Sequence, residues 1–223
     1  MRNTFWFILI LIATTYSCSK DEETVIPDIG YGYAGLEAGK YVVYNVDSFF
    51  YDDFTSTIDT SYYQIKEVVD SKFIDLEGEE AFKIIRYRKE IDSTNWVLID
   101  VWNSKITYTN FQKVEENIRF VKLIFPVRED KVWNGNSMNN LGEMEYEYTS
   151  IDQSETIGGI ALNNVLTVLQ SPEPNAINQI LFEEKYAKGI GMVYKKSMDL
   201  TRANPTAFWL GTDITMTLSS YGG

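Results

Sequence analysis

The sequence contains no histidine, one cysteine, and no apolar run as long as a membrane-spanning helix. Without histidine the chain cannot form a Ser-His-Asp or Cys-His catalytic arrangement, and it lacks the commonest zinc ligand. General acid–base catalysis near neutral pH would have to use a carboxylate, lysine or tyrosine with a shifted pKa. We therefore expect no enzymatic activity, no cofactor and no metal site.

Positive charge is also scarce. The 20 lysines and arginines stand against 32 aspartates and glutamates, so the net charge at pH 7 is −12. A surface of this sign repels a phosphate backbone, which makes nucleic acid a poor partner. One cysteine cannot form a disulfide within the chain, so the hydrophobic core must supply the stability. The 223 residues are enough for a well-buried domain.

The amino-terminal residues have the order of parts of a secretory signal peptide. Arg2 gives the positive start, residues 5–13 are apolar, and Thr15 to Ser17 lead to Cys18. The apolar run is under half of the roughly twenty residues that a membrane span needs. A cysteine at this place resembles the bacterial lipoprotein signal, although that family prefers leucine where Thr15 stands. Ordinary secretion is the alternative.

The lipoprotein resemblance implies that Cys18 is acylated and ties the chain to a lipid bilayer. Ser19 occupies the position where aspartate would retain a lipoprotein in the inner membrane, so the outer membrane is predicted. The next four residues resemble the signal that sends Bacteroidota-type lipoproteins to the cell surface; a periplasm-facing location is the alternative. These residues are Lys20, Asp21, Glu22 and Glu23.

The sequence divides into three predicted parts. Residues 1–17 form the signal peptide, and residues 18–39 form a flexible, glycine-dotted tether. Residues 40–223 form a single β-rich domain, because short β-branched and aromatic runs follow one another throughout this part of the chain.

The spacing of these runs predicts an all-β fold with minor α content. We expect an antiparallel β-barrel or a two-layer β-sandwich of about ten strands. Segments 111–118 and 177–181 have helical spacing, and either could form one short helix that plugs an open end of the sheet. The predicted strands are 41–46, 62–69, 81–89, 96–102, 118–125, 143–151, 165–169, 180–186, 192–198 and 213–219.

Aromatic residues are abundant, with 15 Tyr, 12 Phe and 5 Trp. Trp96 and Trp102 share one face of a predicted strand, whose other face consists of Val97, Ile99 and Val101 and is expected to meet the main core. Tryptophan joins a large apolar area to a polar handle, so its face is a candidate for ligand binding. Packing in a second core layer is the alternative.

On the predicted strand 143–151, glutamates alternate with Met144, Tyr146 and Tyr148. One apolar face and one wet face are typical of an antiparallel sheet that covers a core on one side. We also take Tyr146 and Tyr148 as possible ligand-binding residues. The glutamates could bind calcium, but no loop of calcium-binding spacing accompanies them, and a solvent-facing role is favoured.

Carboxylates near a group of aromatic residues offer one catalytic alternative. A pair of them beside aromatic platforms could hydrolyse a glycosidic bond, with their separation deciding the stereochemistry. A polar loop whose aromatic residues pack on the edge of the domain is the simpler interpretation. The carboxylates are Asp52, Asp53, Asp59 and Asp70.

Two short segments resemble known β-sheet proteins. Residues 186–193 are similar to a Tyr-Ala-x-Gly-x-Gly-x-Val hairpin of uncharacterised secreted proteins, and their glycines predict a tight turn or bulge with positive φ. Gly39-Lys40-Tyr41 resembles the Gly-x-Trp of the first lipocalin strand. Open barrels of the lipoprotein-carrier type are a further analogy, which implies fold and not function.

These observations predict a membrane-anchored envelope protein that binds a glycan or protein ligand through one sheet face or the barrel mouth. A lipocalin-like or carrier-like shield for an apolar ligand is the first alternative. A carboxylate-dependent glycoside hydrolase is the second. The bilayer, contacted through Cys18, is the predicted partner.

Overall fold

The computed structural model describes residues 28–170 and 175–223. Cys18 and residues 20–23 therefore lie outside the described residues. Apart from one short 3₁₀ helix, η1 (Tyr31–Ala34), the regular structure of the described part is β. Within these ranges no helix is both long enough and apolar enough to cross a membrane.

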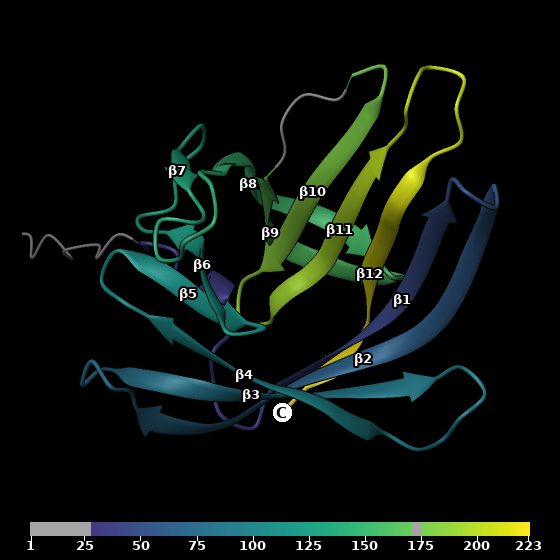
Figure 1. Cartoon of the computed structure of the whole chain (residues 1–223). Helices are drawn as coiled ribbons and strands as arrows, with labels where there is room; N and C mark the ends of the chain where they lie inside the picture. Colours follow the sequence, from purple (N-terminus) through teal and green to yellow (C-terminus); the bar gives the residue numbers. More distant parts are fainter. Residues whose placement is uncertain (1–27, 171–174) are drawn as a thin grey trace, which may run out of the picture.

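All twelve strands belong to one antiparallel sheet with the order β6-β5-β4-β3-β2-β1-β12-β11-β10-β9-β8-β7. The sheet curves into a nearly closed, barrel-like form (Figure 1). The predicted antiparallel all-β fold is confirmed. The strands are β1 (Tyr41–Asp52), β2 (Thr57–Ile74), β3 (Glu80–Glu90), β4 (Val97–Ile106), β5 (Asn110–Glu115), β6 (Ile118–Ile124), β7 (Val132–Asn134), β8 (Glu145–Ile157), β9 (Ile160–Leu169), β10 (Asn178–Ala187), β11 (Gly191–Thr201) and β12 (Leu210–Gly222).

The two ends of the sheet meet between β6 and the β7–β8 region. The amide of Val121 donates a hydrogen bond to the carbonyl of Gly135 at 2.9 Å, and the indole of Trp133 donates to the carbonyl of Val121 at 2.9 Å. The hydroxyl of Tyr148 accepts from the amide of Ile124 and donates to its carbonyl. Backbone and side-chain hydrogen bonds thus close this side.

At one end of the strands the barrel-like sheet is open. The pairing of β4 with β5 begins at Asn103, so residues 97–102 extend beyond β5. The pairing of β10 with β9 begins at Glu183, so residues 178–182 extend beyond β9. In Figure 1 the β11–β12, β1–β2 and β3–β4 hairpins and the start of β10 fan apart at this end.

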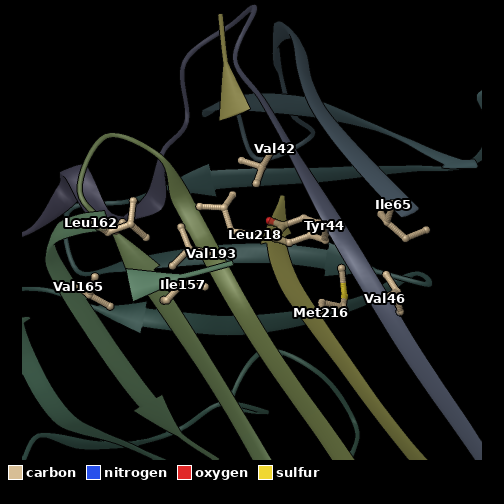
Figure 2. Packing of buried hydrophobic residues seen from close by; sticks show 11 residues of the cluster. Val42, Tyr44, Val46, Ile65, Ile157, Leu162, Val165, Val193, Met216 and Leu218 are labelled. Atoms are coloured by element: carbon tan, nitrogen blue, oxygen red, sulfur yellow. The ribbon is translucent and has the colours of Figure 1, made fainter. Parts of the chain in front are cut away.

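Alternating apolar residues of the central strands form the first core cluster (Figure 2). Val42, Tyr44 and Val46 of β1 are at most 8% exposed, and the intervening Asn45 is exposed. Met216 and Leu218 of β12 belong to the same cluster. The predicted alternation of 213–219 is therefore confirmed, because a strand presents every second side chain to the core.

The domain begins earlier than the sequence predicted. Residues 28–39 were assigned to the tether, but Tyr33 and Ala34 are 1% and 6% exposed and belong to a second core cluster. The amide of Gly189 donates to the carbonyl of Gly32 at 2.8 Å. At Gly35, with φ of +62°, a Cβ would lie 2.4 Å from the backbone of Ile190, so the close approach requires glycine. The many glycines of this segment suggested a flexible tether and concealed the core residue Tyr33.

The two predicted helical segments are strands. Residues 111–118 cover β5 and the start of β6, and residues 177–181 cover the start of β10. Glu116 and Asn117 both have positive φ and connect β5 directly to β6, as in a two-residue hairpin turn. In such short segments the apolar spacing does not separate helix from strand. The prediction also missed β7 as a strand.

The prediction that Val97, Ile99 and Val101 of β4 face the main core was wrong. Val97 and Val101 are 62% and 56% exposed instead of meeting the core. The register shifts between the pairs Arg86↔Asp100 and Tyr87↔Leu98, which leaves Ile99 as an extra residue. Trp102 and Asp100 pair with Ile84 and Arg86 and share their inward face, so Val101 points outward. The bulge changes the orientation only of the residues before Ile99.

Candidate functional site: an open groove beside a buried charge network

A groove of about 320 Å³ lies where the strands begin to fan apart. Its walls come from β1, β2, β3, β4, β11 and β12, and include Ile99 and Ser197 from the parts that extend beyond the closed side. Apolar side chains form most of its surface. These are Val46, Tyr63, Ile65, Ile99, Ile214 and Met216.

The polar lining of the groove is cationic. Arg86, Arg88 and Lys195 contribute to the wall together with Ser197, and no acidic residue of the described part of the chain does so. The guanidinium of Arg88 lies over the ring of Tyr63, 3.8 Å from its centre, and its Nε donates to Glu90 at 2.7 Å.

Behind the groove, a network of ion pairs crosses the interior of the sheet. Lys122 of β6 lies 2.9 Å from Glu184 of β10 and 3.2 Å from Glu115 of β5. Lys195 of β11 contacts the same two carboxylates at 3.3 and 3.7 Å. Since β6 stands at one end of the sheet order and β10 far along it, these pairs join opposite walls.

The network continues along the wall formed by β2 to β5. Lys113 lies 2.9 Å from Glu67, and Arg86 donates from Nε to Glu67 at 3.0 Å and from Nη1 to Asp100 at 2.9 Å. Four cations and four carboxylates balance one another, as burial requires. The members are Arg86, Lys113, Lys122, Lys195, Glu67, Asp100, Glu115 and Glu184.

The most buried members stay ionised. Burial alone would raise the pKa of the Glu184 carboxyl, but the charges of Lys122 and Lys195 outweigh burial and hold it well below its usual range. The same balance lowers the pKa of Glu115 to about 2. The hydroxyl of Tyr186 donates to Glu184 at 2.5 Å, and burial followed by the charge of Glu184 raises the pKa of Tyr186. These groups do not titrate near neutral pH, so the network is suited to holding the walls together.

A smaller cavity of about 50 Å³ lies on the closed side, between Tyr44, Glu67 and Lys113. A cavity of this size has room for a few water molecules at most, since one water needs about 10–15 Å³ of such volume. The larger groove is therefore the better candidate for a ligand.

Three carboxylates outside the groove lie close enough together to suggest a metal ion, namely Asp75, Glu77 and Glu79. The ammonium of Lys105 lies 2.8 Å from Asp75 and 2.6 Å from Glu79, and also pairs with Glu77. Its hydrogen bond is the largest effect that lowers the pKa of Asp75, to about 2. The ammonium of Lys105 thus occupies the place that a metal ion would take between the three carboxylates.

None of the four aromatic residues predicted to bind a ligand lines the groove. The ring of Trp102 is covered by Arg86 and Lys113, at 3.6 and 4.9 Å from its centre. Trp96 lies under Lys89 at 5.1 Å. Tyr146 and Tyr148 are 2% and 0% exposed, and both pack against Trp133 in the second core cluster (residues: Tyr33, Ala34, Phe111, Leu123, Phe125, Tyr146, Tyr148, Leu166, Val168 and Tyr186).

Of the carboxylates considered for glycoside hydrolysis, Asp70 lies far from the other three, which stand at the β1–β2 hairpin. Asp52 stands at the turn before β2, where it accepts a hydrogen bond from Thr55 at 2.8 Å. Asp70 lies towards the other end of β2 and pairs with Lys83 at 2.7 Å. Thirteen strand positions separate Asp70 from Thr57 at the start of β2, about 43 Å at 3.3 Å per residue. A catalytic pair must lie within roughly 5–9 Å, so these two cannot act together.

Sequence reasoning missed the charged residues of the groove and network. One signal for them was available in the sequence. In a strand, residues two positions apart share a face, so a charged residue with apolar residues two positions away is expected on the apolar face. Arg86 follows Ile84 in this way, and Glu184 stands between Phe182 and Tyr186. Such a residue either faces the core or indicates an error in the assigned face.

Comparisons with known proteins leave the function open. No family model and no curated protein matches the chain. A crystal structure from Bacteroides fragilis, of a protein provisionally described as exported and as having a YmcC-like fold, is similar over 86% of this chain and 99% of that chain. The identity is 10% and the TM-score 0.44. A similarity this low carries no argument, so the description of the fold rests on the structure of this chain alone.

Proposed function

We propose that this chain is a lipid-anchored envelope protein whose groove binds and shields the apolar part of a ligand. Cys18 and the preceding signal support the anchor, and the groove supports the binding role. The anchor would keep the groove close to a bilayer, since two or more acyl chains hold a protein stably on a membrane.

The observation that carries the binding role is the groove itself. Its volume of about 320 Å³ falls within the range of about 300–1,000 Å³ typical of small-molecule sites. Most of its lining is apolar, and contact with such a surface removes apolar ligand area from water. Its walls are paired strands joined by the buried ion pairs behind them, so the site is formed before the ligand arrives.

A sugar platform built on the tryptophans is less well supported. Stacking of a sugar needs an open aromatic face, whereas the ring of Trp102 is covered by two cations. The ring of Tyr63, which does line the groove, is covered by Arg88. The shielding role, first among the alternatives from the sequence, therefore becomes the favoured one.

The experiment measures the binding of N-phenyl-1-naphthylamine, an uncharged dye whose fluorescence rises in apolar surroundings. The protein is the full chain carrying Cys18→Ala, without detergent. We expect saturable binding that Ser197→Trp abolishes, because the new side chain fills the groove.

Met198→Trp is the matched control. Met198 follows Ser197 on β11, so its side chain points to the opposite face, and binding should be retained. Absence of dye binding to the parent chain, or equal binding by Ser197→Trp, would refute the proposed role.

A further inference from the structure

The cations of the groove differ in how fully they are neutralised. Arg86 contacts two carboxylates, Glu67 and Asp100, and its guanidinium lies over the ring of Trp102. Its side chain is 12% exposed. The charge of Arg86 is therefore already neutralised by Glu67 and Asp100 of the network.

Arg88 is held in position but keeps donors free. Among residues 28–170 and 175–223 its one ion pair is with Glu90, whose side chain is 59% exposed, so water screens the interaction. That pair uses Nε and leaves the two terminal nitrogens for another acceptor. Stacking on Tyr63 fixes the plane of the guanidinium, which lowers the entropy lost when a ligand binds.

Lys195 is the outermost ammonium of the buried network. Its distances of 3.3 and 3.7 Å to Glu184 and Glu115 exceed the 2.9 and 3.2 Å of Lys122 to the same residues. Its side chain is 27% exposed, against 4% for Lys122. Lys195 also lines the groove, where its ammonium, with three donors, can reach a ligand.

We propose that the groove binds an acidic amphiphile, whose apolar body lies against the aliphatic wall and whose carboxylate or phosphate contacts Arg88 and Lys195. This inference rests on the proposed function, since it names the ligand class of the same groove. A planar guanidinium with two free terminal nitrogens matches the paired oxygens of such groups.

The distribution of charge supports an acidic ligand over a neutral one. The chain as a whole carries a net charge of −12, yet the groove lining, as far as the described residues form it, contains three cations and no carboxylate. The carboxylates that balance Arg86 and Lys195 belong to the network and not to the groove lining. A ligand in the groove therefore meets the cations first.

The test uses three competitors of equal chain length to displace N-phenyl-1-naphthylamine from the full chain carrying Cys18→Ala. Dodecanoate carries a carboxylate, dodecyl phosphate a phosphate, and dodecanol no charge. We expect at least one acid to displace the dye at a concentration about tenfold lower than dodecanol, the effect of one charge-assisted hydrogen bond. A preference for dodecanoate indicates a free fatty acid, and a preference for dodecyl phosphate a phosphate-bearing lipid.

Arg88→Gln should remove most of this advantage, whereas Lys89→Gln should preserve it. Lys89 is the next residue of β3, so it carries the same charge on the opposite face. Equal competition by dodecanol and both acids, measured on the parent chain, would overturn the inference while leaving the proposed function intact. An unchanged advantage in Arg88→Gln would overturn it as well. A parent chain that binds no dye would overturn the proposed function and, with it, the inference.

Discussion

Replacing Glu184 by glutamine tests whether the buried ion pairs hold the walls of the sheet together. Glu184 is 1% exposed and pairs with Lys122 at 2.9 Å and Lys195 at 3.3 Å. Glutamine has nearly the same shape but no charge, so Lys122, itself 4% exposed, loses one of its two carboxylates. The substitution therefore removes charge while changing the packing very little.

The magnitude follows from the burial of the pair. Removing one partner of a buried ion pair costs about 3–5 kcal/mol, because the other charge is left unbalanced. Here Glu115 remains 3.2 Å from Lys122 and offsets part of this loss, so we expect the lower limit, about 3 kcal/mol. With a urea m-value of about 2 kcal/mol/M, the unfolding midpoint would fall by about 1.5 M.

Glu155→Gln is the control. Glu155 pairs with Lys185 at 2.6 Å, but the two side chains are 27% and 22% exposed, against 1% and 4% for Glu184 and Lys122. Water reaches this partly buried pair, so we expect it to contribute about 1 kcal/mol. Urea unfolding followed by circular dichroism measures both variants. A loss below about 0.5 kcal/mol in Glu184→Gln, or an equal loss in both variants, would refute the assigned role of the network.

Three further predictions concern the core, the lysine-filled carboxylate cluster and the anchor. Val46→Ala, at 2% exposure, should cost about 2 kcal/mol, whereas Val101→Ala, at 56%, should change stability by less than about 0.5 kcal/mol; equal losses in urea unfolding would contradict the exposed placement of Val101. An NMR titration should place the pKa of Asp75 at about 2, below the usual 3.8. The contribution of the Asp75 carboxylate to stability is therefore complete above pH 3.8 and is lost as the pH falls through 2. Lys105→Met should move this pKa up towards 3.8, and an unmoved value would disprove the pairing. Cys18→Ala should release the chain from membranes into the soluble fraction on cell fractionation, and unchanged retention would exclude the acyl anchor.

The strand content could be read from the sequence because the signal is local. Residues 41–46 and 213–219 alternate or cluster in ways that only a strand can bury on one side, and both lie within observed strands. Positive φ at Gly189 and Gly191 was also predictable, and both have it. These features depend on neighbouring residues alone.

The candidate site depended on contacts between residues distant in the sequence. Lys122 and Glu184 stand 62 positions apart, and no local pattern indicates that a lysine of one strand will neutralise a glutamate of another. The bulge at Ile99 shows the same limit, since the extra residue changes the face of the residues before it and no local pattern predicted it.

The sequence by itself therefore determined that this chain is a β protein without histidine. Its lipoprotein-like leader stays a prediction. Tertiary structure decided that the twelve strands form one curved sheet, and that its open side carries an apolar groove with cations on its wall. The reason is physical: strand formation follows from the local alternation of side chains, whereas the closure and opening of a sheet depend on which distant strands pair and where each pairing ends.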